Sequence, residues 1–383
     1  MDTPRVVKIL ADLVAIPSVN PAYDPGSAGE AAMADHIEAW ALGLGLPVSR
    51  LEVFPGRDNV HVRLQGPESG PTLLFEAHTD TVGVDGMAAP FQPEIRDVRM
   101  FGRGTCDTKG SLAAMMAAIE ELFARRNELP CSVELLAGVD EETSGTGVRA
   151  HVVAGNRADG AVVGEPTELR VINEHNGCIR GEIVVTGKAA HTSVASEGVN
   201  AIDGMADTVL ALHRLNADLT QRAGGPAANG SFTVSLISGG TGINIVPERC
   251  VIGYDRRTVP GDAAEDVIAE IDAVLATVRA SRPELVIERC IPALVDNALQ
   301  TDVTAPIVVA ASAVAVALGL DGTPARVPYG SDASKLQVIG GIPTIVFGPG
   351  SIALAHAAGE YVPLADLIAA TAFYRDLALS FGR

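Results

Sequence analysis

The stretch TLLFEAHTD, residues 72–80, is an apolar run that ends in a histidine and an aspartate. Two further apolar runs end in acidic residues: 132–139 is followed by Asp140, Glu141 and Glu142, and 161–164 is followed by Glu165. Short apolar runs of this length are typical of buried strands. Ligands of open α/β sheets bind beyond the carboxyl ends of the strands, so we expect these side chains to converge on one edge of a sheet.

Around these runs the pattern alternates between helix and strand. The spacing of apolar residues predicts helices over 5–15, 28–44, 111–126, 304–318 and 364–381, and a strand over 344–347. Between them, residues 181–290 follow the order strand, helix, strand, strand, helix, strand, which is one β-α-β-β-α-β unit. The sequence therefore predicts a discontinuous α/β domain over 1–175 and 293–383, with an inserted domain over 176–292.

Composition limits the classes of partner and the cell compartment that we expect for this protein. The chain has 383 residues, a length that fits two domains, and a formal net charge of −19 without a run of Lys or Arg. A nucleic acid or an anionic membrane surface needs a basic patch, so neither is an expected partner. The longest apolar stretch, 307–320, is short of the roughly 20 residues of a membrane span. Five cysteines scattered without a CxxC pair, and an N-terminal stretch interrupted by charges and Pro17, predict a cytoplasmic protein.

Five short motifs carry the candidate chemistry. They are His78-Thr79-Asp80, Gly102 to Gly110 (GRGTCDTKG), Asp140-Glu141-Glu142, Gly164 to Thr167 (GEPT) and Ala355-His356. Taken singly, each has an ordinary explanation, because most histidines at strand ends are structural and adjacent glutamates are usually solvated. Taken together, two histidines and several carboxylates suit two borderline divalent ions with coordination left open for water, whereas a structural zinc site prefers thiolates.

With these motifs the sequence resembles, over nearly its whole length, the dinuclear-zinc amidohydrolase and exopeptidase family of acetylornithine deacetylase, succinyl-diaminopimelate desuccinylase, aminoacylase and glutamate carboxypeptidase. The resemblance implies a zinc-exopeptidase-like α/β fold, a mixed sheet flanked by helices, with an inserted ferredoxin-like α+β lid and dimerisation domain. It also implies two divalent metal ions per chain, zinc by resemblance, although cobalt and manganese accept such a mixed nitrogen and oxygen site. A homodimer through the inserted domain is a further implication.

The resemblance assigns roles around the metal ions. Five residues would hold them: Asp107 as the bridge, His78 and Glu165 at one ion, and Glu142 and His356 at the other. Asp80 would orient His78 through its far ring nitrogen. Two cations lower the pKa of a shared water toward about 7 and polarise the scissile carbonyl. Glu141 would take the proton of that water and return it to the leaving amine.

The inserted domain and the C-terminal part would supply further residues. By resemblance, His191 donates a hydrogen bond to the tetrahedral oxyanion, commonly across a dimer interface. Asn244 and Arg257 resemble substrate-binding residues, and a guanidinium can clamp a carboxylate through two parallel bonds. A surface ion pair is the ordinary alternative for Arg257. Gly330 and Ser331 match segments that line the substrate side, with an ordinary turn as the alternative.

Three functions follow in order of preference. The GEPT motif and the chain length favour an N-acyl-amino-acid deacylase similar to acetylornithine deacetylase. The alternative is a metallo-exopeptidase or dipeptidase that releases an amino acid from a short peptide. A non-catalytic, metal-stabilised binding protein is the remote alternative, and the presence of Glu141 argues against it. Thr108 and Ala195 depart from the family pattern of Met and Pro, but neither change removes a metal ligand.

Overall fold

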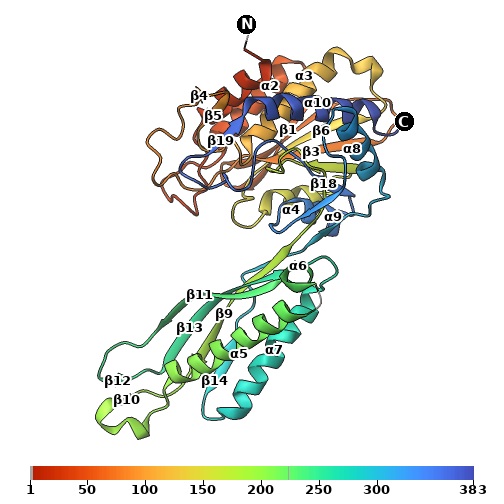
Figure 1. Ribbon diagram of the computed structural model, residues 1–383. Coiled ribbons are helices and arrows are strands. Elements are labelled where there is room, and N and C mark those ends of the chain that lie inside the picture. Colours follow the sequence, from red (N-terminus) through yellow and green to blue (C-terminus); the bar gives the residue numbers. More distant parts are fainter. Residues whose placement is uncertain (1–2, 223) are drawn as a thin grey trace. The chain divides into compact units, whose positions relative to one another are not determined.

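The apolar run over residues 72–78 forms strand β3 (Thr72–His78), which is buried along nearly all of its length. In the computed structural model, which describes residues 3–222 and 224–383, the chain divides into two units (Figure 1). The first unit comprises residues up to Glu174, Thr301–Arg326 and Ser331–Arg383. The second unit comprises His175–Gln300 and Val327–Gly330. It extends beyond residue 292, the predicted end of the insertion, because β15 (Leu294–Asp296) still pairs with β9 (Gly177–Thr186).

A mixed sheet organises the first unit. Its strands are β1 (Val48–Phe54), β2 (Arg57–Leu64), β3, β6 (Ser132–Gly138), β7 (Gly160–Val163), β8 (Ile172–His175) and β18 (Thr344–Val346). They lie in the order β1-β2-β6-β3-β7-β18-β8. The central neighbours β6, β3, β7 and β18 are parallel, whereas β1, β2 and β8 are antiparallel to theirs. The short strands β16 (Leu299–Gln300) and β17 (Ala325–Val327) lie where the chain passes between the units.

Helices cover both faces of this sheet. They are α1 (Arg5–Val14), α2 (Ala31–Gly43), α3 (Lys109–Ala124), α4 (Thr146–Val153), α8 (Pro306–Ala317), α9 (Ala333–Val338) and α10 (Leu364–Ser380). Figure 1 shows α2, α3 and α10 on one face and α4 and α9 on the other. Helix α3 is buried from Lys109 to Ile119 because alanines at 113, 114, 117 and 118 let α1 and α10 approach closely. The predicted helices of this unit are confirmed, with shifts of a few residues at their ends.

Aromatic and aliphatic side chains form the core beneath these helices. Phe75 of β3 packs against Tyr374 of α10 with ring centroids 5.3 Å apart, and Phe347 stacks on Phe373. All four side chains are fully buried. Burying one such side chain stabilises the folded state by about 1.5–3 kcal/mol. The cluster therefore holds α10 against the sheet. A small second sheet of order β19-β5-β4, built from β4 (Glu94–Arg96), β5 (Arg99–Phe101) and β19 (Tyr361–Pro363), lies in the same unit.

The second unit is a five-stranded antiparallel sheet with two long helices, in which β15 pairs with β9 beside the main strand order. Its main elements are β9, α5 (Ala201–Gln221), β11 (Ser231–Gly239), β13 (Arg249–Thr258), α7 (Ala264–Ser281) and β14 (Val286–Arg289). The sheet order β11-β13-β9-β14 and the chain order confirm the predicted ferredoxin-like β-α-β-β-α-β unit. Helix α5 begins at the Asn200 cap, whose side-chain oxygen accepts hydrogen bonds from the N–H groups of Ile202 and Asp203.

This unit has a hydrophobic core of its own, centred on residues such as Ile183, Leu212 and Ile271. Shorter elements complete it: β10 (Ala190–His191), η2 (Thr192–Glu197), α6 (Gly225–Asn229) and β12 (Ile245–Val246). Within the part of the chain that the structure describes, none of the helices combines the length and apolar character that a bilayer crossing requires.

Candidate metal centre

Three parallel strands deliver polar side chains to one edge of the main sheet. In the register of the sheet, His78 at the end of β3 lies opposite Gly138 at the end of β6, and Glu76 lies opposite Val163 at the end of β7. The residues that follow these strands, among them Glu142 and Glu165, therefore emerge beside His78. This arrangement agrees with the rule that ligands bind beyond the carboxyl ends of such strands.

Asp107 is the centre of the resulting cluster. Its Oδ1 lies 3.0 Å from Nε2 of His78, and its Oδ2 lies 3.2 Å from Nε2 of His356. The same nitrogen of His356 lies 3.0 Å from Oε2 of Glu142, and Nε2 of His78 lies 4.0 Å from Oε1 of Glu165. Each oxygen of one carboxylate thus faces a different histidine, as a bridging ligand would require.

The structure contains two overlapping groups of possible ligand atoms. His78, Asp107 and Glu165 form one group, and Asp107, Glu142 and His356 form the other, with the ligand atoms of each group within 4.8 Å of one another. Oε1 of Glu142 is buried and has no hydrogen-bond partner among the described residues. Because an orphaned carboxylate oxygen in this position is available to a cation, the residues present fit two divalent metal ions with mixed nitrogen and oxygen ligands.

Burial and crowding perturb the acid–base behaviour of the cluster. Burial, together with the nearby charge of Asp107, raises the pKa of Glu142 to about 7 and holds that of Glu165 well above its usual range. Hydrogen bonds to Asp107 and Glu142 raise the pKa of His356 to about 10. Burial would raise the pKa of Asp107 as well, but its hydrogen bonds with His356 and His78 lower it. The cluster therefore concentrates negative charge, which favours bound cations.

Asp80 supports His78 and also holds the segment that follows β6. Nδ1 of His78 lies 3.0 Å from the main-chain oxygen of Asp80, which can only accept, so Nδ1 carries a proton and Nε2 faces the carboxylates. The carboxylate of Asp80 lies farther from Nδ1, at 3.5 Å. Its two oxygens also accept hydrogen bonds from the main-chain N–H groups of Glu141 and Glu142.

Asn20 also belongs to the hydrogen-bond network beside the candidate metal centre, although the sequence patterns do not reveal it. Its side-chain amide donates to Oδ2 of Asp80 at 2.8 Å and to Oδ1 of Asp140 at 3.0 Å, and all three residues are buried. The amide therefore separates two carboxylates beside the centre. Asn20 is distant in sequence from both partners and precedes a proline, where an asparagine is usually read as part of a turn.

Three of the predicted site residues lie in the His175–Gln300 part of the second unit. Nδ1 of His191 accepts a hydrogen bond from the main-chain N–H of Ser193 at 3.1 Å, which leaves Nε2 as the protonated nitrogen of the neutral ring. Arg257 is about one-third exposed and pairs with Asp255 at 2.9 Å, so the ion pair considered from sequence is present. Asn244 is exposed, and its main-chain oxygen accepts from the N–H of Thr192.

The remaining two predicted residues lie next to each other at the boundary between the units. Gly330 belongs to the second unit and Ser331 to the first. Ser331 is buried at the start of α9, and its Oγ accepts from the N–H of Ala333 at 3.3 Å. These contacts are those of an ordinary helix start. The structure thus brings together the five candidate ligands with Asp80 and Glu141, and places His191, Asn244, Arg257 and Gly330 in the other unit.

Known proteins resemble this chain in sequence along most of its length. The model of Peptidase family M20/M25/M40 matches residues 74–380. An acetylornithine deacetylase of Yersinia pestis is 30% identical over 95% of this chain and 94% of its own length. An acetylornithine deacetylase of Vibrio campbellii (strain ATCC BAA-1116) is 31% identical over 94% of each chain.

Solved structures similar to this one include metallopeptidases of low sequence identity, which support the fold alone. A tripeptidase from Staphylococcus aureus has a TM-score of 0.79 at 19% identity, covering 99% of this chain and 98% of that one. An M20 family metallo-carboxypeptidase from Sulfolobus solfataricus has a TM-score of 0.77 at 18% identity, covering 99% and 100%. By its match over most of its length, this chain belongs to peptidase family M20/M25/M40 and is a metal-dependent amide hydrolase.

Proposed function

We propose that this enzyme removes the acyl group from an N-acyl amino acid. The sequence identity to acetylornithine deacetylases, which extends over nearly the whole of both chains, supports this substrate class. The observation that carries the proposal is the position of Asp107, whose two oxygens lie 3.0 and 3.2 Å from two different histidines. A metallo-exopeptidase would use the same centre on a peptide bond, and the experiment below separates the two.

The candidate ligands divide between two ions. Asp107 would be shared by both ions, His78 and Glu165 would complete one site, and Glu142 and His356 would complete the other. Zinc suits this set of imidazoles and carboxylates, and cobalt or manganese are the alternative ions. When bound, the two ions supply a Lewis acid for the amide carbonyl and make hydroxide available near neutral pH.

Glu141 moves the proton in this mechanism. Its main-chain N–H is held by Asp80, and the next residue is the ligand Glu142, so its carboxylate is kept beside the centre. Burial raises the pKa of Glu141 well above its usual range, and the nearby His78 opposes that effect. A carboxylate of raised pKa can take the proton of the attacking water and then donate it to the leaving amine.

The second unit supplies His191, Asn244 and Arg257 to the substrate. With Nδ1 occupied by the N–H of Ser193, Nε2 of His191 is the donor that an oxyanion needs. Arg257 exchanges its ion pair with Asp255 for the carboxylate of the substrate, and Asn244 adds a polar contact. Gly330 and Ser331, where the chain returns to the first unit, would line the substrate side, as the family resemblance implies.

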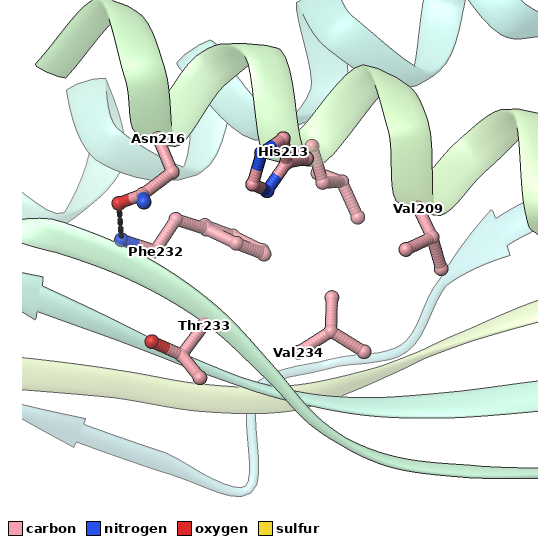
Figure 2. Close-up of a pocket in the computed structure, with 7 residues that line it drawn as sticks. Val209, His213, Asn216, Phe232, Thr233 and Val234 are labelled. Atoms are coloured by element: carbon pink, nitrogen blue, oxygen red, sulfur yellow. Dashed lines mark hydrogen bonds between the residues drawn. The ribbon is translucent and has the colours of Figure 1, made fainter.

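The enzyme forms a homodimer through α5 and β11 of the second unit. β11 is an edge strand of its sheet, and on these two elements Leu210, Leu236 and Ile237 are 56%, 71% and 65% exposed. A pocket of about 310 Å³ lies between them. Val209, Phe232 and Val234 are among the side chains in its wall (Figure 2). Unpaired strand edges and exposed apolar side chains both favour association.

Two further features complete the proposal. The five cysteines are all free thiols, which supports a reducing, cytoplasmic location. The acidic net charge of −19 supports a small-molecule substrate over a nucleic acid or a membrane surface.

Metal content and substrate turnover test the proposed function together. The wild type should contain close to two metal ions per chain, and Asp107→Ala should lose most of them because both sites share this ligand. Glu141→Gln should keep both ions but lose about 10²- to 10⁴-fold in kcat, the usual contribution of a general base. Glu68→Gln, an exposed carboxylate in the loop before β3, is the matched control and should resemble the wild type.

Hydrolysis of a panel of N-acyl amino acids and dipeptides then identifies the substrate class. Turnover of acyl amino acids alone supports the deacylase, and turnover of dipeptides alone supports the exopeptidase. Less than one metal ion per chain after reconstitution would contradict the ligand set. No turnover of any amide, with ligand binding unaffected in Glu141→Gln, would favour a metal-stabilised binding protein.

A further inference from the structure

Glu360 is a buried carboxylate whose two oxygens are fully occupied by donors from the loop that carries Asp107. One oxygen, Oε1, accepts from the main-chain N–H groups of Cys106 at 2.8 Å and Asp107 at 3.1 Å. The other, Oε2, accepts from the N–H of Gly104 at 3.1 Å and from Nη1 of Arg103 at 2.6 Å. The Glu360 side chain is only 1% exposed, so these four N–H donors take the place of water around its carboxylate. The four donors together are called the cradle of Glu360 below.

The same carboxylate joins this loop to the segment that carries His356. Glu360 follows His356 by four residues, and its main-chain N–H donates to the carbonyl of Ala357 at 3.3 Å. Its own carbonyl accepts from the N–H of Gly102, and the next residue, Tyr361, pairs with Phe101 where β19 meets β5. The side chain and the main chain of Glu360 therefore both connect two segments that lie more than 200 residues apart in the sequence.

Arg103 extends the connection to a third loop. Its guanidinium donates to Glu360, to the carbonyl of Gly83 through Nε and Nη2 at 3.1 and 2.8 Å, and to the carbonyl of Ala357 at 3.5 Å. Arg103 is 2% exposed, so its charge is balanced by the carboxylate of Glu360. The Arg103–Glu360 pair therefore connects the loop of Gly83 and the segment of Ala357 to the turn that precedes Asp107.

We propose that Glu360 is a positioning residue that presents the carboxylate of Asp107 to both metal sites at once. It touches neither a metal ion nor the substrate. It acts by fixing the peptide groups of Cys106 and Asp107 relative to the His356 segment, so that Oδ1 and Oδ2 of Asp107 each reach a different site. The inference rests on the proposed dinuclear centre.

The chemistry of the cradle explains why a carboxylate is needed there. All four partners are N–H donors, and a carboxylate offers only acceptors. A glutamine of the same size would place an NH₂ group against two of these donors, on whichever side it turned. The resulting repulsion has to be relieved by moving the 102–107 loop, and Asp107 moves with it.

Metal titration of Glu360→Gln is the test. Metal-free protein is titrated with Co²⁺, with binding followed by visible absorption and by calorimetry, at a temperature where circular dichroism shows the variant fully folded. The wild type should bind two ions. In Glu360→Gln the second ion should bind about 10- to 100-fold more weakly, the usual effect of losing a partner of a metal ligand, and its absorption bands should change. A purely structural role would lower the melting temperature and leave both ions in place.

Two more variants keep the result interpretable. Glu94→Gln changes an exposed carboxylate on β4 of the same small sheet and should titrate like the wild type. Arg103→Lys keeps a positive charge beside Glu360 and all three main-chain N–H bonds, so it decides the question if Glu360→Gln does not fold. Its second ion should bind more weakly than in the wild type, by a smaller factor than in Glu360→Gln.

The outcomes separate this inference from the proposed function. If the wild type binds two ions and both variants bind two with unchanged affinity and spectra, Glu360 does not position Asp107, while the dinuclear centre stands. If the wild type itself binds fewer than two ions, the proposed centre is wrong and the role of Glu360 is wrong with it.

Discussion

His151 illustrates how a single residue of this protein is held in one charge state. It is 3% exposed on α4, and its ring lies 5.4 Å from that of His61. Burial lowers the pKa of His151 to about 4, with the charge of His61 acting in the same direction and Glu134 opposing it. The folded protein therefore keeps His151 neutral at pH values where the unfolded chain protonates it.

Acidification should consequently destabilise the wild type through this residue. A depressed folded-state pKa contributes stability that is present above the unfolded value of about 6.5 and is lost as the pH falls toward about 4. Between pH 7.5 and 4.5, His151→Gln should lose roughly 1–3 kcal/mol less of its unfolding free energy than the wild type. Urea denaturation at the two pH values measures this, with His36→Gln at a half-buried position of α2 as control. Equal losses in wild type and His151→Gln would contradict the assignment.

At the scale of elements, the approach of β7 to α3 determines where Glu165 lies. Gly164 follows β7 directly, and a Cβ at this position would lie 2.5 Å from Cβ of Ser111 and 3.0 Å from Cε of Met115. Both neighbours belong to the buried face of α3. Only a residue without a side chain allows the strand end and the helix to pack at this distance.

Gly164→Ala should therefore disturb both stability and the metal centre. The added methyl group forces β7 and α3 apart, at a cost of about 1–3 kcal/mol in unfolding free energy, and it shifts the neighbouring Glu165. Urea denaturation and metal content of the purified variant measure the two effects. Gly43→Ala, in helix α2 with no heavy atom within 4 Å of the added Cβ, should be neutral or up to about 1 kcal/mol more stable. Full stability and full metal content in Gly164→Ala would contradict this account.

At the scale of the whole molecule, each unit has a hydrophobic core of its own, and the second unit carries the exposed apolar face of α5 and β11. An independent core lets the second unit serve in assembly without participating in metal binding.

Leu236→Glu should convert the proposed dimer to a monomer, because a charge on the edge strand would be buried without a partner. Sedimentation velocity measures the assembly state, and metal content should remain at the wild-type level. Ile291→Glu, at a side chain 92% exposed outside α5 and β11, is the control and should remain dimeric. If activity falls with the monomer, His191 acts across the interface, whereas unchanged activity places it within one chain. A wild type that sediments as a monomer would contradict the proposed assembly.

The sequence by itself determined the elements and their order, because those depend on local patterns. Runs such as 72–78 and 132–138 become strands through continuous apolar burial, and the β-α-β-β-α-β order of the second unit follows from periodicity alone. The donor types at His78, Asp107 and His356 could also be read directly, since metal ions select side chains by chemistry.

Only the tertiary structure decided how those donors are held. Asn20 contacts Asp80, and Glu360 contacts the loop of Asp107, across long separations in sequence that no local pattern records. The carboxylate of Asp80 lies 3.5 Å from Nδ1 of His78, and its oxygens also accept from the N–H groups of Glu141 and Glu142, which the sequence does not reveal. Such bonds depend on the sheet bringing the strand ends together, because burial requires each polar group to have a partner.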